Sequence, residues 1–338
     1  MDIWSWLQIV LICLGCVLVI FILFTSCVCA MLNGIIFSRQ DKNPQFKYFT
    51  PEYFNLTVEH MPVRLYGVEL AANLYTDRPL ENCDRVVIFQ HGFGAGSSSY
   101  MTEIAHFAKQ GFAVVAADAY GCNNSAGKKV YGFYAGAQAV IAAYSGVKSD
   151  ERLKDKPVIL VGHSWGAYSV LAACATIKPQ GVVALSGFNA PAQCLCDQIK
   201  VSGGSFGRFY APLLHGWFYL GNIFRFGAKG NTKANKAIKK SGVKTLLIQG
   251  EKDATVAYKH SAVKLVEGEN VTKLILPDKK HNPYNTVEAE KKLAELTGGH
   301  DFANGQEAEE YFKNFDWSAA TEEDEAVMSK IDGFIKGV

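Results

Sequence analysis

The pattern of apolar and polar positions divides the chain into an N-terminal apolar run and a longer segment of alternating short runs. From Ile3 to Ser38 there is no charged side chain. A helix needs roughly 20 apolar residues to cross a hydrocarbon layer, so this run predicts a transmembrane anchor over residues 1–38. A polar linker over residues 39–52 follows, and we expect one folded domain over residues 53–338. Deletion of residues 1–38 should then leave a soluble, folded body.

Eight short apolar stretches in the folded segment predict strands. The first two, "FNLTV" and "VELAANLY", predict an antiparallel pair. The other six lack polar alternation, which is typical of strands buried on both faces of a parallel sheet. They cover residues 85–90, 112–118, 157–161, 181–186, 244–250 and 272–277. Helix-like runs separate several of these strands, so right-handed crossovers and a mostly parallel α/β sheet are expected.

The ends of the folded segment and its middle differ from this alternation. The last helix is marked by acidic residues at its start, Glu322 to Asp324, and by one apolar face. Between Ser186 and Lys244 no strand-like run occurs, and aromatic residues are frequent. A structureless loop of that length is uncommon in a compact domain, so residues 187–243 predict a helical cap insertion. Ordinary packing of extra helices and an apolar substrate lid both remain open for it.

Composition and charge exclude several classes of protein. The chain has 338 residues, about half of them hydrophobic, and a net charge of +2 with scattered basic residues, which argues against a nucleic-acid partner. Five cysteines lie outside the apolar run without the spacing of a disulfide framework or a zinc site. "GFGAG" lacks the spacing of a dinucleotide fingerprint, and no phosphate-binding loop motif occurs. We therefore expect no cofactor and no metal.

The flanks of the apolar run bear on its role. Arg39, Lys42 and Lys47 follow it, whereas Asp2 precedes it, so the positive-inside rule predicts a single-pass protein with its body on the cytoplasmic side. A cleaved secretory signal is the alternative, and "SCVCA" offers a weak cleavage-like site. The missing N-terminal Lys or Arg and the length of the run favour the retained anchor.

A serine stands between two glycines where an apolar strand meets a helix of small residues, in the stretch "VILVGHSWGAYSVLAACA". A serine on such a turn projects past the sheet in a strained backbone geometry, and the flanking Gly162 and Gly166 avoid clashes. The positive end of the helix and the free N–H of Trp165 face the same place. Ser164 is therefore a candidate nucleophile, although the pentapeptide alone is only moderately specific.

Two further residues of the types that a catalytic triad needs, an acid and a histidine, follow later strands. Asp253 comes shortly after the strand over residues 244–250, and His281 comes after the strand over residues 272–277. A carboxylate and an imidazole at these strand ends can reach a serine at the same edge of the sheet. Glu251 competes with Asp253 for the acidic role, but its position in the pattern is less favourable.

The motifs "HGFGAGS", "DAYGCNNS", "GHSWG", "GEKDATV" and "KKHN" occur in one order along the chain. By them, residues from about 55 to 338 resemble the α/β-hydrolase superfamily, closest to its monoglyceride-lipase-like and serine-aminopeptidase-like branch. The resemblance implies an α/β-hydrolase fold with Ser164, His281 and Asp253 as the triad. It also implies an oxyanion hole formed by the backbone N–H groups of Phe93 and Trp165. Asn123 departs from the pattern, because many members have glycine there.

We therefore expect a membrane-anchored serine hydrolase that cleaves a carboxylic ester with a small-molecule or lipid-derived acyl group. A peptidase or amidase of the aminopeptidase-like branch and a binding protein without turnover are the alternatives. Basic residues dominate residues 187–243, which suits an acidic acyl group or a phospholipid surface. His91 and His163 are expected to be structural. The remaining histidines, expected on the surface or at caps without partners, are His60, His106, His215, His260 and His300.

Overall fold

The computed structural model describes residues 2–297 and 305–338, so His300 lies outside the described residues. An eight-stranded sheet in the order β1-β4-β6-β5-β7-β8-β9-β10 forms its centre. The strands are β1 (Thr57–His60), β4 (Ala72–Thr76), β5 (Val86–Gln90), β6 (Ala113–Ala117), β7 (Val158–His163), β8 (Gly181–Leu185), β9 (Lys244–Gly250) and β10 (Val271–Leu276). A small hairpin of β2 (Arg64–Leu65) and β3 (Val68–Glu69) lies apart from it.

Strand direction follows the expected pattern. β1 pairs antiparallel with β4 and β4 with β6, whereas the five pairings from β6 through β5, β7, β8 and β9 to β10 are parallel. Strands β5 to β8 are buried along their whole length. β10 differs from the expectation of burial on both faces, because it is the edge strand and none of its residues is buried.

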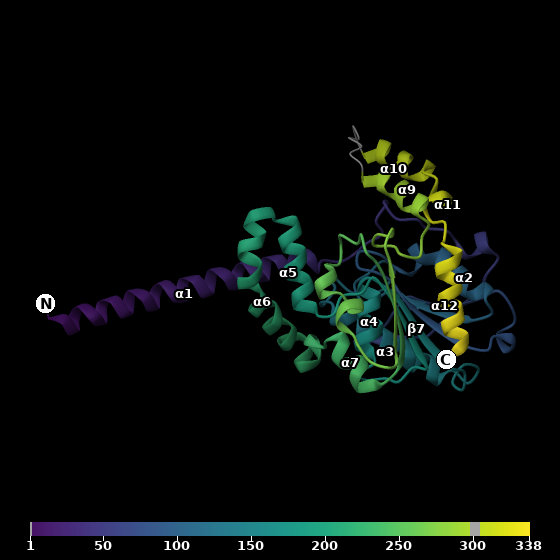
Figure 1. Cartoon of the computed structure of the whole chain (residues 1–338), viewed down its shortest axis with the longest axis horizontal. Helices are drawn as coiled ribbons and strands as arrows, with labels where there is room; N and C mark the ends of the chain where they lie inside the picture. The colour runs from purple at the N-terminus through teal and green to yellow at the C-terminus, as the bar shows by residue number, and fades with distance from the viewer. Residues whose placement is uncertain (1, 298–304) are drawn as a thin grey trace.

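Helices cover both faces of the sheet (Figure 1). One face carries α3, α4 and α7, and the other carries α2 and α12, each over its own apolar core. Their bounds are α2 (Met101–Lys109), α3 (Tyr134–Ser149), α4 (Trp165–Ala173), α7 (Ala234–Ser241) and α12 (Glu325–Gly337). The predicted acidic start of the last helix acts as a cap, since the Asp324 carboxylate accepts the N–H groups of Ala326 and Val327.

The N-terminal helix α1 (Ile3–Ile36) leaves the body as a long projection (Figure 1). Its side chains are exposed as far as Phe24, and it packs on the body only from Thr25 onward. Phe37 is 3% exposed, and the Arg39 guanidinium donates to the carbonyl groups of Ser125 and Gly127 at 3.0 and 2.6 Å. The packed body therefore begins well before residue 53, and residues 39–52 are held against it.

Two groups of helices are added to the sheet. Between β8 and β9 lie α5 (Pro191–Ser202) and α6 (Gly204–Phe226), followed by α7, and α6 packs against α1. Between β10 and α12 lie α9 (Val287–Thr297), α10 (Gly305–Asn314) and α11 (Trp317–Ala320). The sequence analysis assigned helices to the first interval and no element to the second. A short α8 (Ala262–Leu265) completes the helices named along the described chain.

Candidate active site

Ser164 lies in a strained turn between β7 and α4. Its φ of 57° and ψ of −116° are a conformation that few non-glycine residues adopt. The flanking glycines are required by close approach: a Cβ on Gly162 would lie 2.4 Å from the Gly166 carbonyl oxygen, and a Cβ on Gly166 would lie 2.0 Å from the Gln90 carbonyl oxygen. The turn thus holds a half-buried serine at the carboxyl edge of the central strands.

Asp253 and His281 are joined across the loops that follow β9 and β10. His281 Nδ1 lies 2.9 Å from Asp253 Oδ2, and the Asp253 side chain is only 1% exposed. The other carboxylate oxygen accepts the backbone N–H groups of Thr255 and Val256 at 2.8 and 3.0 Å. Glu251, the competing acid, is exposed and makes no side-chain contact with His281 among the described hydrogen bonds and ion pairs.

These contacts determine the charge of the Asp253 carboxyl group. Burial alone raises its pKa, but the hydrogen bond and positive charge of His281 and the two backbone N–H donors together outweigh burial. The pKa of Asp253 is therefore held below its ordinary value, and the carboxylate is ionised at neutral pH. An ionised acceptor at Nδ1 fixes the imidazole with its Nε2 available as a proton acceptor.

Ser164 and His281 line the same cavity, which has a volume of about 440 Å³. No hydrogen bond between their side chains occurs among the described residues, in contrast to the direct contact of His281 with Asp253. Catalytic hydrogen bonds in ligand-free sites are often long and tighten when substrate binds. The structure therefore brings the aspartate–histidine pair together and leaves the serine beside it.

The two residues expected at the oxyanion hole lie at or directly beside the same cavity. Phe93 lines it, and Trp165 follows Ser164 as the first residue of α4. Neither backbone N–H has a protein acceptor among the described hydrogen bonds. His91, expected to be structural, is fully buried: its Nε2 accepts the Ala119 N–H at 2.9 Å, and its Nδ1–H donates to the Gly92 carbonyl at 2.8 Å.

His163 links the three loops of the site. Its Nε2–H donates to the His281 carbonyl at 2.9 Å, so its Nδ1 accepts the Tyr100 hydroxyl at 2.8 Å. The Tyr100 oxygen in turn accepts the Gly92 N–H at 3.1 Å. Burial, together with the nearby charge of His281, lowers the pKa of His163 to about 3, so the ring is neutral. A neutral ring can serve both hydrogen bonds at once, whereas a protonated one could not accept from Tyr100.

The walls of the cavity come from regions that the sequence analysis did not assign to the site. Gln45, Phe46 and Lys47 lie on one side, and Leu293 and Leu296 of α9 and Trp317 of α11 lie on another. No lining residue belongs to residues 187–243, so that insertion does not form the lid that was one of its two open interpretations. The helices after β10 cover the site instead.

One buried ion pair adds charge to this wall. Lys47 Nζ lies 3.3 Å from Glu103 Oε1, and the two side chains are 8% and 4% exposed. Tyr100 and Tyr284 also line the cavity. Sequence reasoning missed Lys47, Glu103 and Tyr100, because no motif contains them. The signal that could have found the cover is the unusually long interval between His281 and the last helix.

Of the other histidines, His60, His106 and His260 have carboxylate partners that the sequence analysis did not expect. His106 lies between Glu323 and Asp332, 3.1 and 3.0 Å from their carboxylates, and its side chain is 18% exposed. His260 Nδ1 lies 2.6 Å from Asp197 Oδ2. None of these pairs lines the cavity around Ser164. In the described part of the chain, no three His, Cys, Asp or Glu side chains are arranged to hold a metal ion.

Asn123, the departure from the glycine pattern, adopts a φ of 39°. A left-handed backbone favours glycine and next asparagine, so asparagine suits a position where the resemblance led us to expect glycine.

Comparison with known proteins gives the fold. Residues 85–218 match a family model described as the alpha/beta hydrolase fold. Among solved structures, an esterase from Pyrococcus furiosus is 18% identical, with a TM-score of 0.56, over 78% of this chain and 97% of that one. Est1E from Butyrivibrio proteoclasticus, solved with ferulic acid bound, is 19% identical with a TM-score of 0.51, covering 70% of this chain and 97% of that one.

A third similar structure is an acylaminoacyl peptidase from Pyrococcus horikoshii, at 14% identity and a TM-score of 0.52, covering 75% of this chain and 44% of that one. No curated protein matches the sequence. The expected fold class is confirmed: the chain has the α/β-hydrolase fold, with a mostly parallel sheet flanked by helices and one N-terminal helix long and apolar enough to span a membrane.

Proposed function

We propose that this α/β-hydrolase-fold chain is a membrane-anchored serine hydrolase that cleaves a carboxylic ester through an acyl-enzyme intermediate. The observation that carries the proposal is the 2.9 Å contact of His281 Nδ1 with the buried, ionised Asp253, in a cavity shared with Ser164. That contact leaves His281 Nε2 available as a base toward Ser164, which the elbow holds in a strained turn.

In the first step, Ser164 Oγ attacks the ester carbonyl carbon while His281 Nε2 takes the hydroxyl proton. Asp253 keeps the imidazole in the correct tautomer and stabilises its charged form. The carbonyl oxygen becomes an oxyanion and accepts hydrogen bonds from the N–H groups of Phe93 and Trp165. Collapse of this intermediate breaks the ester C–O bond, and the imidazolium gives its proton to the departing alkoxide. The products of this step are an alcohol and the acyl-serine.

In the second step, water attacks the acyl-serine. His281 accepts a proton from the water and returns it to Ser164 Oγ as the acyl–oxygen bond breaks, which releases a carboxylic acid. Loss of one oxyanion donor typically costs a few kcal/mol of transition-state stabilisation, on the order of a hundredfold in rate. Phe93 and Trp165 lie at or directly beside the same cavity, which supports their assignment as the two oxyanion donors.

Two features of the cavity favour an ester with an uncharged, apolar acyl group over a peptide with a free amino group. Phe46, Leu293, Leu296 and Trp317 supply apolar walls. Glu103, an acidic side chain in the lining, is buried and paired with Lys47, so its charge is already offset and is less suited to an ammonium group. A peptidase or amidase of the type represented by the acylaminoacyl peptidase remains the second candidate.

Anchoring is the second part of the proposal. The N-terminal helix has a mean hydropathy of 3.1 over its most apolar 18 residues, and no residue of that window is buried in the protein. An exposed apolar helix of this length is stable in a bilayer and unstable in water. The basic residues after the helix, Arg39, Lys42 and Lys47, favour a body on the cytoplasmic side.

A fluorophosphonate probe tests the chemistry, because it reacts with activated serines. We expect wild-type protein to be labelled and Ser164→Ala to lose labelling together with at least about a thousandfold in ester turnover. Ser99→Ala is the matched control, since Ser99 lines the same cavity and should leave Ser164 labelled. A folded wild-type protein without labelling, or labelling that survives Ser164→Ala, would contradict the proposal and favour a binding role.

A further inference from the structure

Helix α6 carries two apolar faces on opposite sides. Its buried residues recur every three or four positions, at Gly207, Ala211, Leu214, Phe218 and Asn222. A second set of large apolar side chains recurs with the same spacing on the other side and is exposed to solvent. This set, which we call the α6 outer face, consists of Phe206, Phe209, Leu213, Leu220, Ile223 and Phe224.

The degree of exposure is unusual for such residues. Phe224 is 87% exposed, Phe206 70% and Phe209 69%. A helix on the surface of a water-soluble domain keeps one apolar face inward and a polar face outward. A contiguous exposed apolar surface marks a site that another apolar phase or partner covers. Pro212, within the helix, and Gly216 in the same row do not interrupt the periodicity of the outer face.

The outer face lies next to the proposed anchor. Trp217 Nε1 of α6 donates to Thr25 Oγ1 of α1 at 3.0 Å, and an Arg225 N–H group donates to Asn33 Oδ1, also at 3.0 Å. In Figure 1, α6 lies across the base of α1, and the N-terminal part of α1 projects beyond it. The level at which α1 leaves the body is thus also the level of α6.

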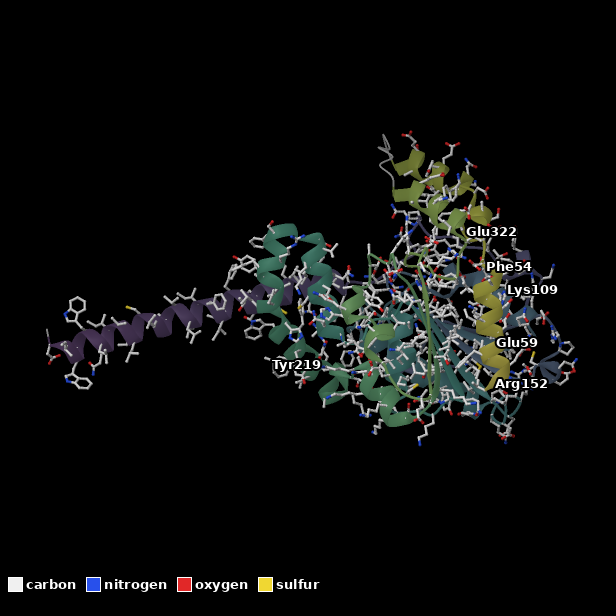
Figure 2. All side chains as sticks on the ribbon, in the orientation of Figure 1. Phe54, Glu59, Lys109, Arg152, Tyr219 and Glu322 are labelled. Carbon is white, nitrogen blue, oxygen red and sulfur yellow. The ribbon has the colours of Figure 1, made fainter. Side chains whose placement is uncertain are left out.

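The length of the free part of α1 relates that level to a bilayer. Ile3 to Phe24 is the part whose side chains do not pack on the body, and Figure 2 shows side chains projecting from it on all sides. Its 22 residues span about 33 Å as a helix, close to the roughly 30 Å of a hydrocarbon core. Trp4 and Trp6 stand at the far end, as aromatic residues do at a membrane interface. When this part spans a bilayer, Thr25 and α6 lie at its near surface.

The charges of the insertion suit the same position. Helix α6 contains no acidic residue, and it carries Arg208 and Arg225. An interfacial helix combines an apolar face in the acyl boundary with basic side chains near the headgroups. None of residues 187–243 lines the cavity of Ser164, so the basic balance of this insertion does not serve that cavity and is available to anionic headgroups.

We propose that the α6 outer face is a membrane-docking surface that inserts into the same bilayer leaflet that α1 enters, so that the protein is held by a spanning helix and an interfacial helix together. The inference rests on the proposed anchoring by α1 and does not depend on the hydrolytic reaction. Two points of attachment fix the orientation of the body, because a single helix would leave it free to tilt and rotate over the surface.

Depth measurement on the full-length chain tests the proposal. Single cysteines at Phe209→Cys or Leu220→Cys would carry a nitroxide spin label, in a chain whose exposed Cys13, Cys16 and Cys27 are replaced by alanine. The protein is reconstituted in vesicles of phosphatidylcholine and phosphatidylglycerol. The relative access of oxygen and of a neutral nickel chelate to each label reports its depth. The matched control is Ile275→Cys, an apolar residue on β10 that is also exposed.

We expect the oxygen-to-nickel ratio at positions 209 and 220 to exceed that at position 275 several-fold. Equal ratios at all three positions would overturn the proposal. Labels at 209 and 220 that are shielded from both reagents and broadened by spin–spin coupling would identify a second copy of the chain as the occupant and overturn it too. In a separate variant, native Cys16 is kept and carries the label, so that it reports on α1. An aqueous signal at Cys16 would show that the anchor itself does not enter the bilayer. Fluorophosphonate labelling of the same samples reports separately on Ser164.

Discussion

The two groups of added helices differ in the polarity of their outward faces. Helices α9 to α11 turn Leu293, Leu296 and Trp317 toward the cavity and keep charged residues such as Glu288 and Glu295 outside. Helix α6 packs its buried face mainly against α5, also contacts α1, and leaves its outer face exposed. A helix that covers a site in water needs a polar exterior, whereas a helix at a bilayer does not. The outward face of a helical insertion therefore indicates which medium it meets.

The contacts that hold the two groups differ in the same way. Ion pairs between side chains hold the segment after α11: His106 pairs with Glu323, and Lys279 Nζ lies 2.7 Å from Asp324. In α9, Glu290 accepts the N–H of Lys280, the residue before His281, at 3.0 Å. Helix α6 meets α1 through a hydrogen bond from Trp217 to the hydroxyl of Thr25. We therefore expect pH to change the stability of the segment that follows the first group, and lipid composition to change the contacts of the second group.

Truncation should have the largest effect on stability and membrane binding, because one deletion removes only the free part of α1 and the other removes its packed part as well. Removal of residues 2–24 takes away only the part that does not pack on the body, and we expect a folded chain that still binds vesicles weakly through the α6 outer face. Removal of residues 2–38 also deletes Phe37, whose ring lies 5.9 Å from Phe93 and 5.2 Å from Phe133. Loss of a buried phenylalanine costs about 3–5 kcal/mol.

Denaturant unfolding in detergent and the rate of fluorophosphonate labelling measure this difference. The longer truncation should be less stable and should label more slowly, because Phe37 packs on the residue expected to supply an oxyanion N–H. Equal stability of the two truncated chains would mean that residues 25–38 do not belong to the packed body, which would then begin only after the apolar run, as the sequence pattern predicted.

A matched pair of leucines tests which group covers the cavity. Leu296 is 6% exposed and lines the cavity, whereas Leu213 is 39% exposed on the α6 outer face. In Leu296→Asp, a carboxylate must lose water when an apolar acyl group binds, at a cost of about 1–3 kcal/mol, so kcat/KM should fall about tenfold or more. Leu213→Asp should leave kcat/KM for a water-soluble ester unchanged. The reverse result would mean that α6 covers the substrate.

Much of this architecture could be predicted from local patterns. Seven of the predicted strands fall within a few residues of the observed ones because each is a short apolar run between turns, and the Asp253–His281 contact follows from the strand ends where those residues stand. Such features depend on neighbours in sequence and on one sheet geometry. The start of the packed body could not be found in this way, because the residues that hold Phe37 lie more than fifty positions further along.

The covering helices and the partners of His106 escaped prediction for the same reason. Nothing in the spacing of His106, Glu323 and Asp332 indicates that α2 and α12 lie side by side on one face of the sheet. Likewise, aromatic residues in the 187–243 insertion are equally compatible with a lid and with a membrane surface until α1 is placed beside them. The sequence alone shows that α6 is apolar. Its position beside α1 is needed to infer that its outer face meets a membrane.

The ion pairs around His106 predict a pH-dependent stability where α12 and the segment that leads into it pack against α2. Burial alone lowers the pKa of His106, but hydrogen bonds with Asp332 and Glu323 outweigh it and raise the pKa to about 9. The raised pKa means that the stabilisation is complete below the ordinary value near 6.5 and is lost as pH rises from about 6.5 to 9. Burial also raises the pKa of Glu323. That opposing cost limits the expected loss to about 1–2 kcal/mol.

Denaturant unfolding at pH 6, 7.5 and 9 measures this loss, and His106→Asn should remove the dependence over that range. His60→Asn is the control, because His60 pairs with Glu69 on the exposed surface and contributes little. Spin labels on the α6 outer face should report the same depth throughout. A flat stability profile for the wild-type protein would exclude the charged His106 pair as a stabilising contact between α2 and α12.

Two tryptophans offer the finest comparison, since each donates one hydrogen bond from its indole. Trp217 Nε1 donates to Thr25 Oγ1 at 3.0 Å beside the anchor, and Trp317 Nε1 donates to the Phe312 carbonyl at 2.9 Å beside the cavity. Replacement of either by phenylalanine removes one donor and little apolar area, at a cost of about 1 kcal/mol. Trp317→Phe should raise KM for an apolar ester a fewfold through a looser cover. Trp217→Phe should leave KM unchanged and increase the motion of a spin label at position 209. If Trp217→Phe moved KM as Trp317→Phe does, the two groups of helices would be coupled, and the division of the molecule into a membrane side and a substrate side would fail.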